Sequence, residues 1–272
     1  MVLVRVGVAA FLSVIVVLLL LKKRWFVFKP SDEGAKGIGR TNPMVWFVGA
    51  LVLYIGVMIA GSGLAALIGP NPDDPLSVGA AQAVGMYGAG VPVSIAALVV
   101  LWRLFPGSRF RLSWCDLLYG VGAFVVAIPV LLLSADAAVI VRTLMVGSAP
   151  DQIAHPTLGL ILSAPSDPRV WMMLAGAVVG APMLEETVYR GLLQTSVVRA
   201  TGSRWVAIVL VASLFALSHR AGGVPWHALV PIFVLGAVCG VVTEKRGVGA
   251  AMVTHGAFNA SQVLLAFLVV GR

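Results

Sequence analysis

The feature that most constrains this chain is the repetition of apolar stretches, each about long enough to cross a lipid bilayer. The hydrocarbon core of a bilayer takes about 20 apolar residues in helical form. Only helices and closed barrels satisfy their own backbone hydrogen bonds in lipid. The sequence therefore predicts an all-α, polytopic membrane bundle of about eight transmembrane helices. To within a few residues at either end, we expect them at 6–21, 44–68, 79–102, 116–141, 170–190, 204–219, 227–243 and 247–271.

The scarcity of charge argues against a soluble domain. Charged residues make up 11% of the chain, whereas soluble domains carry about 25%. The expected organisation is a single membrane domain in two parts. Residues 1–169 hold about four N-terminal helices with their loops, and residues 170–272 hold the remaining helices, which carry most of the polar side chains at membrane depth.

The net charge of +8 is explained by membrane topology rather than by binding to a nucleic acid. With the N-terminus outside, thirteen of the 19 Lys and Arg residues fall on the inner side and five on the outer side. Such an asymmetry is typical of membrane proteins, whose inner loops are the more basic. We therefore expect the lipid bilayer as a partner, no nucleic acid, and both ends of the sequence on the outer side.

Two of the segments that connect the predicted helices are long enough to contain structure of their own. Residues 22–42 form a basic inner segment in which Trp25, Phe26 and Phe28 are expected to lie at the membrane interface. The basic residues that follow the first apolar stretch favour a retained helix over a cleaved signal peptide. Residues 147–169 form the longest outer loop, which could be a re-entrant or lid segment.

Two adjacent glutamates, Glu185 and Glu186, lie inside an apolar stretch. A carboxylate in the hydrocarbon region costs several kcal/mol, so an ionisable pair there predicts a functional site. Glu186 and Arg190 are four residues apart and share a helix face, which favours an ion pair. Glu185 is turned about 100° away. One glutamate is thus expected to be neutralised in the structure and the other left for chemistry, and spacing alone does not decide which.

Later helices add three polar residues at a similar depth. His219 ends one stretch, and His255 and Asn259 share a face of the last one. At 1.5 Å per residue, Glu186, His219 and His255 lie about 20, 22 and 13 Å from the nearest inner charges, which is compatible with one shared site. A desolvated carboxylate beside histidines suits water activation, and the same groups suit a divalent ion.

Several other polar residues receive a structural interpretation. His155 is placed in a loop, His227 at the start of a helix near the interface, and Asp136 near the outer end of a helix. The zinc-helix pattern His-Glu-x-x-His, the Gly-x-Ser-x-Gly elbow and the Gly-Lys-Ser/Thr phosphate loop are all missing from the sequence. Two rival hypotheses stay open: an ion- or proton-coupled transporter that uses the glutamate pair, and a non-catalytic membrane scaffold.

Three short patterns occur together in this order: Glu185-Glu186-x-x-x-Arg190, Phe215-x-x-x-His219 and His255-x-x-x-Asn259. In combination they resemble the CAAX prenyl endopeptidase family of intramembrane proteases, also called the CPBP or ABI family. The resemblance covers about residues 170–265. It implies a helical bundle that hydrolyses a peptide bond at the membrane, so that residues 170–272 would be the catalytic part.

The resemblance also implies a role for each residue. Glu185 would be the main catalytic carboxylate, and His219 would help it to activate water. His255 and Asn259 would stabilise the oxyanion or position the substrate. Glu186 and Arg190 would support the site.

Cofactor and substrate are less constrained by the resemblance. Family members have been described both as metalloproteases and as metal-independent glutamate proteases, so a zinc ion on Glu185, His219 and His255 and no cofactor at all both stay open. Eukaryotic members remove a tripeptide after a prenylated cysteine. The richness in Ala, Val and Gly favours a prokaryotic plasma-membrane protein with a membrane-associated peptide or protein substrate, as in bacteriocin processing.

Overall fold

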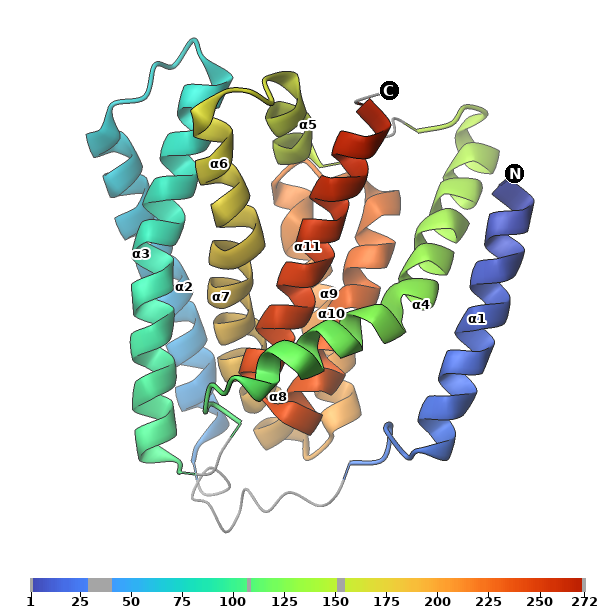
Figure 1. The fold of residues 1–272 in the computed structure, drawn as a ribbon. Helices are drawn as coiled ribbons and strands as arrows, with labels where there is room; N and C mark the ends of the chain where they lie inside the picture. Colours follow the sequence, from blue (N-terminus) through green and yellow to red (C-terminus); the bar gives the residue numbers. More distant parts are fainter. Residues whose placement is uncertain (1, 29–40, 107–108, 151–154, 271–272) are drawn as a thin grey trace.

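The chain folds into a bundle of helices, shown in Figure 1 as a computed structural model that describes residues 2–28, 41–106, 109–150 and 155–270. These residues contain helices and turns and no strand. The elements are α1 (Val2–Lys22), α2 (Pro43–Ile68), α3 (Pro75–Leu104), α4 (Cys115–Val146), α5 (Pro156–Ser163), α6 (Pro168–Ala175), η3 (Gly176–Gly180), α7 (Ala181–Glu186), η4 (Thr187–Leu193), α8 (Gln194–Thr201), α9 (Arg204–Ala221), α10 (Trp226–Arg246) and α11 (Val248–Val270).

The predicted polytopic all-α fold is confirmed. Within the described residues, seven helices are long and apolar enough to cross a membrane. The remaining predicted span, 170–190, lies in a continuous helical path from Pro168 to Thr201 that two π-helical segments, η3 and η4, divide into short elements. This path runs beyond the predicted end because the side chains of Arg190 and Gln194 bond to carbonyl oxygens of α10 instead of water.

Helix starts follow a local rule that the sequence already contains. Side-chain oxygens of Asn42, Asp74 and Asp167 each accept the backbone N–H two residues further on. A proline follows each of these three residues and occupies the first helical position. An oxygen-bearing cap followed by proline satisfies and preorganises a helix N-terminus, so α2, α3 and α6 begin where the sequence indicates.

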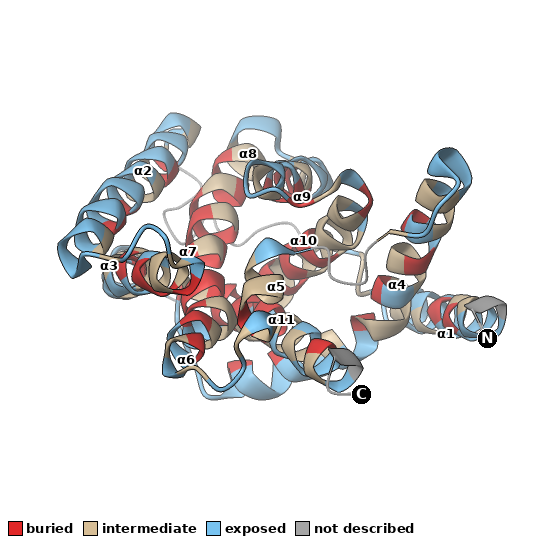
Figure 2. Ribbon diagram, turned by 90° about the horizontal axis from the view of Figure 1, so that it is seen from above, coloured by how far each residue is buried: buried red, intermediate tan, exposed pale blue. Residues whose placement is uncertain are grey.

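The interrupted path α6–η3–α7–η4–α8 lies inside the bundle (Figure 2). The α2–α3 pair packs on one side of it, and α9, α10 and α11 pack on the other. Small residues permit the close approach of α2 and α3, since a Cβ on Gly85 would come within 2.3 Å of the carbonyl oxygen of Gly61. The polar face of the central path is therefore surrounded by helices.

Helix α1 packs mainly against α4, at the edge of the bundle. An ion pair between Arg5 and Asp136 joins the two helices, with 3.0 Å between Arg5 Nε and Asp136 Oδ2. The structural interpretation of Asp136 is thereby supported.

The two connecting segments are partly described. Phe26 and Phe28 pack on Trp205, with ring centroids 5.9 and 5.3 Å apart, at the start of α9. The rest of the basic inner segment, residues 29–40, lies outside the described residues. The stretch expected as an outer loop, 147–169, contains the helix α5, and its residues 151–154 also lie outside the described residues.

Candidate active site

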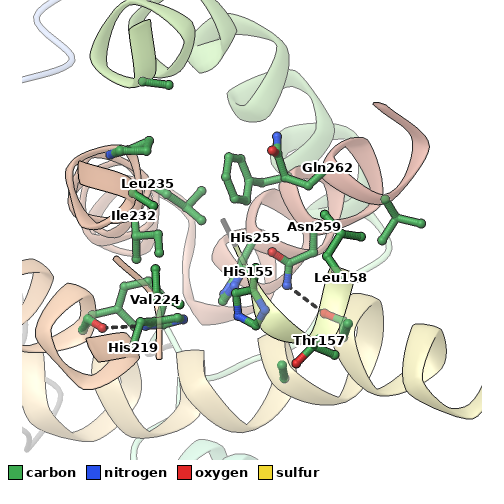
Figure 3. Close-up of a pocket in the computed structure, with 18 of the residues that line it drawn as sticks. His155, Thr157, Leu158, His219, Val224, Ile232, Leu235, His255, Asn259 and Gln262 are labelled. Carbon is green, nitrogen blue, oxygen red and sulfur yellow. Dashed lines mark hydrogen bonds between the residues drawn. The ribbon is translucent and has the colours of Figure 1, made fainter. Parts of the chain in front are cut away.

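A cavity of about 390 Å³ opens at the end of the bundle that carries both termini and α5. This is the end that the distribution of basic residues predicts to be the outer one. Its walls come from α3, α4, α5, η3, α7, α9, α10 and α11. Four residues predicted for the site line it together: Glu185, His219, His255 and Asn259. Figure 3 shows His219, His255 and Asn259 facing this space.

The predicted pair of Glu186 and Arg190 lies directly behind the cavity wall and is fully buried. Arg190 Nε lies 3.2 Å from Glu186 Oε2, which is ion-pair distance, although the two groups are not aligned as a hydrogen bond. The guanidinium also donates to the carbonyl oxygen of Gly236 at 3.0 Å and lies 4.5 Å from the ring centre of Phe215. A buried charge needs such compensation, so this pair is a structural unit of the wall.

His255 stands between the two glutamates. Its Nδ1 lies 2.9 Å from Glu186 Oε1, and its Nε2 lies 3.9 Å from Glu185 Oε2. An ionised carboxylate only accepts hydrogen bonds, so we assign a proton to Nδ1. Glu186 therefore fixes the orientation of the imidazole ring and directs Nε2 toward the cavity.

His219 is oriented by its own helix. Its Nδ1 lies 2.8 Å from the carbonyl oxygen of Phe215, one turn earlier in α9. A carbonyl oxygen only accepts, so Nδ1 carries the proton and Nε2 keeps a lone pair in the neutral ring. The ring of Phe215 packs edge-on against both His219 and His255, with centroids 4.8 and 5.5 Å apart. Phe215 thus sets the positions of both imidazoles.

Glu185 differs from Glu186 in its exposure to the cavity. Its side chain lines the cavity and is 23% exposed, whereas the Glu186 side chain is 0% exposed. The buried oxygen Oε2 of Glu185 has no hydrogen-bond partner among the described residues. Glu186 is therefore paired within the protein, and Glu185 is the glutamate that faces the cavity.

Asn259 is held by a backbone carbonyl of η3 that accepts no hydrogen bond from the backbone of the central path. Asn259 Nδ2 donates to the carbonyl oxygen of Ala177 at 2.7 Å. In the π-helical segment the N–H of Ala181 bonds to the carbonyl oxygen of Gly176. The next residue, Pro182, has no N–H to give. The carbonyl of Ala177 is left for a side chain from another helix, and Asn259 takes it.

The three residues named as metal ligands, Glu185, His219 and His255, line one cavity but do not form a compact ligand set. In the described part of the chain, no group of three His, Cys, Asp or Glu side chains lies close enough to hold a metal ion. The arrangement does not fit a preformed zinc site, and the metal dependence stays a prediction for experiment.

Besides Thr157 and Gln262, one tyrosine and two histidines that the sequence interpretation did not assign to the cavity also line it. Tyr87 comes from α3, His155 precedes α5, and His227 begins α10. Burial and the neighbouring His219 lower the pKa of His155. All four histidines of the chain therefore line one cavity. No local pattern signals this, because each lies in a different element.

Comparison with known proteins agrees with the geometry. Residues 167–261 match the family described as type II CAAX prenyl endopeptidase Rce1-like. No curated protein and no solved structure matched the chain. The matched segment contains all three motifs and the whole interrupted path that carries the glutamate pair. Over residues 167–261, this integral membrane protein is therefore similar to the Rce1-like family of type II CAAX prenyl endopeptidases, a family of peptidases.

Proposed function

We propose that the protein is an intramembrane endopeptidase that hydrolyses a peptide bond with a water molecule activated by Glu185 and His219. The observation that carries this proposal is the unpartnered oxygen of Glu185, which is buried at the wall of a cavity that His219, His255 and Asn259 also line. A buried carboxylate oxygen without a partner is costly unless a ligand completes it. Water is the ligand that peptide hydrolysis requires.

In the first step a water molecule between Glu185 and the substrate loses a proton to the Glu185 carboxylate. The resulting hydroxide oxygen bonds to the carbonyl carbon, and the carbonyl oxygen becomes an oxyanion. His219 presents an unprotonated Nε2 to the same space and orients the water by accepting its second hydrogen.

In the second step the tetrahedral intermediate collapses and the C–N bond breaks. Protonated Glu185 returns its proton to the leaving amine, so the products are a carboxylic acid and an amine. Asn259 stabilises the oxyanion with the amide hydrogen that Ala177 does not take, and His255 positions the substrate. Glu186 and Arg190 hold the wall behind them. A pocket screened from bulk water strengthens each of these polar interactions.

The substrate that suits this cavity is a membrane-associated peptide or protein segment. Glu185 is the one Asp, Glu, Lys or Arg side chain among the described residues that line it, and much of the remaining lining is aliphatic or aromatic. Such a lining favours an extended segment with apolar side chains. The composition favours a prokaryotic plasma membrane, where peptide processing of the bacteriocin type is a more natural role than maturation of prenylated proteins.

The full-length protein in proteoliposomes tests the proposal. We expect it to cleave members of a library of unmodified peptides, with the products identified by mass spectrometry. A prenylated CAAX peptide is tested as the alternative substrate. Glu185→Gln should abolish every cleavage that the wild type performs, and Asp73→Asn in the exposed turn between α2 and α3 should retain the same cleavage sites. Cleavage that persists in Glu185→Gln would refute the mechanism.

Metal dependence is decided in the same assay. If Glu185 acts on water directly, dialysis against a chelator should not change the cleavage rate. The rate should then show no correlation with the metal content that remains in the protein. A rate that follows bound zinc in proportion would replace this mechanism with a metal-assisted one.

A further inference from the structure

The oxyanion donors predicted from the sequence are already partly engaged. Asn259 Nδ2 gives one hydrogen to the carbonyl oxygen of Ala177, and His255 Nδ1 bonds to Glu186. Neutral His255 then has no N–H left for a substrate. Stabilising a tetrahedral intermediate requires donors directed at the developing charge. These two residues leave one amide hydrogen of Asn259 for that purpose, so a further donor from another helix would strengthen the site.

Tyr87 is such a donor, and it comes from outside the segment that matches the family. It belongs to α3, in the N-terminal half of the chain, and lines the same cavity as Glu185. The sequence interpretation placed the chemistry in the C-terminal helices alone. The structure brings α3 against η3 and α7, so a side chain from the first half reaches the site.

The ring of Tyr87 is held in a slot formed by two glycines of η3. A Cβ on Gly176 would lie 2.6 Å from ring carbon Cδ2, and a Cβ on Gly180 would lie 2.5 Å from Cγ. No real side chain tolerates such contacts, so both positions must lack a Cβ while the ring is there. A ring fixed in this way presents its hydroxyl from a defined position.

The hydroxyl itself is available. None of the described residues forms a hydrogen bond with it, and it is not among the polar atoms sealed away from the cavity. Half-buried tyrosines normally place their O–H on a partner. Here a substrate carbonyl oxygen in the cavity can be that partner.

We propose that Tyr87 is a further catalytic residue, whose hydroxyl donates a hydrogen bond to the carbonyl oxygen of the scissile peptide as it becomes an oxyanion. The assignment rests on the proposed endopeptidase function and adds a donor to it. No proton is transferred, because the hydrogen stays on the phenolic oxygen and the bond shortens as negative charge develops.

The test compares Tyr87→Phe with Tyr54→Phe in full-length protein in proteoliposomes. Tyr87→Phe removes the hydroxyl and keeps the ring in its slot. Tyr54, on the neighbouring helix α2, packs against the adjacent core and does not line the cavity, so it is the matched control. For a peptide that wild type cleaves and Glu185→Gln does not, we expect Tyr87→Phe to lower kcat about 100-fold. KM should change by less than about twofold, since the bond forms with the transition state.

A binding measurement separates this residue from the function as a whole. The probe is the same peptide with the scissile amide replaced by a phosphinate, which carries a tetrahedral oxyanion. Tyr87→Phe should weaken phosphinate binding about as much as it lowers kcat. The unmodified peptide is tested in the inactive Glu185→Gln protein, where adding Tyr87→Phe should leave its binding unchanged. Equal losses in the two phenylalanine variants, or an unchanged kcat in Tyr87→Phe, would overturn the Tyr87 assignment alone. Wild type that neither cleaves peptides nor prefers the phosphinate would overturn the endopeptidase function together with it.

Discussion

Asn259 donates its side-chain amide to the carbonyl oxygen of Ala177 at 2.7 Å, across from α11 to the π-helical segment that precedes the glutamate pair. This bond joins the last motif of the chain to the first. It exists because a π-helical turn and a proline leave that carbonyl without a backbone donor. The irregular geometry of the central path therefore has a direct consequence for the position of a site residue.

Replacing Pro182 with alanine restores an N–H that competes for the freed carbonyls of η3. We expect Pro182→Ala to weaken the hold on Asn259 and to lower peptide cleavage by about tenfold, a loss of roughly 1.4 kcal/mol of transition-state stabilisation. The protein should still fold, because alanine is a good helix former. Pro92→Ala within α3 is the control, since Pro92 does not line the cavity. A similar loss of cleavage in both variants would show that the effect is not specific to Pro182.

The buried pair of Glu186 and Arg190 is expected to be strongly cooperative. Either Glu186→Gln or Arg190→Met alone leaves one buried charge without its partner and should lower the free energy of unfolding by about 3–5 kcal/mol. The double variant should lose less than the sum of the two. Denaturant unfolding in detergent measures all four proteins. Strict additivity would mean that the two side chains do not interact as their 3.2 Å separation indicates.

Gly256 allows α11 to approach the central path closely. A Cβ at this position would lie 2.7 Å from the backbone carbonyl oxygen of Val178, which has no rotamer with which to move away. We expect Gly256→Ala to destabilise the protein by about 1–3 kcal/mol through overpacking, measured by thermal unfolding in detergent. Gly122→Ala in α4 meets no atom within 4 Å and should be neutral or slightly stabilising. A stable Gly256→Ala protein would contradict this tight contact.

An ion-pair cluster at the α5 end of the bundle predicts that the stability of the folded protein decreases at acidic pH. Arg169 Nη2 lies 2.6 Å from Asp167 Oδ2, and Arg169 also pairs with Asp74 at the start of α3. The hydrogen bonds from Arg169 lower the pKa of Asp167 from 3.8 to about 2. The folded state thus binds fewer protons than the unfolded state at acidic pH. The stability from this pair is present above about pH 4 and is lost as the pH falls toward 2.

The thermal unfolding midpoint measured between pH 5 and pH 2 tests this cluster. Wild type should lose stability more steeply over that range than Arg169→Gln, which has no ion pair to lose. Arg142→Gln removes an arginine that bonds to the carbonyl oxygen of Ser148 instead of to a carboxylate, so it should follow the wild-type slope. If the unfolding midpoint fell equally with pH in all three proteins, the ion pairs of Arg169 would not be the cause of the acid sensitivity.

Local rules account for most of what the sequence predicted correctly. Capping residues followed by proline mark the starts of α2, α3 and α6, and apolar length marks the spans. The ion pair of Glu186 and Arg190 follows from i,i+4 spacing. These features depend on residues within one or two turns, so no knowledge of the neighbours in space is needed.

Other features depend on contacts between distant segments. The helical path continues beyond position 190 because Gln194 finds a carbonyl oxygen on α10, which no local pattern indicates. The commitment of Glu186 and the availability of Glu185 depend on where His255 lies. Tyr87 and His155 reach the cavity because α3 packs against η3 and α7, and α5 packs against α3 and α11.

The sequence by itself determined a membrane bundle, the motifs that carry its family resemblance, and the pairing of residues one helical turn apart. The tertiary structure decided which glutamate faces a cavity, which donors are already engaged, and which residues of the first half complete the wall. The physical reason is that hydropathy and helical spacing act along the chain, whereas burial and hydrogen-bond satisfaction at the site depend on helices far apart in sequence that meet only in the folded bundle.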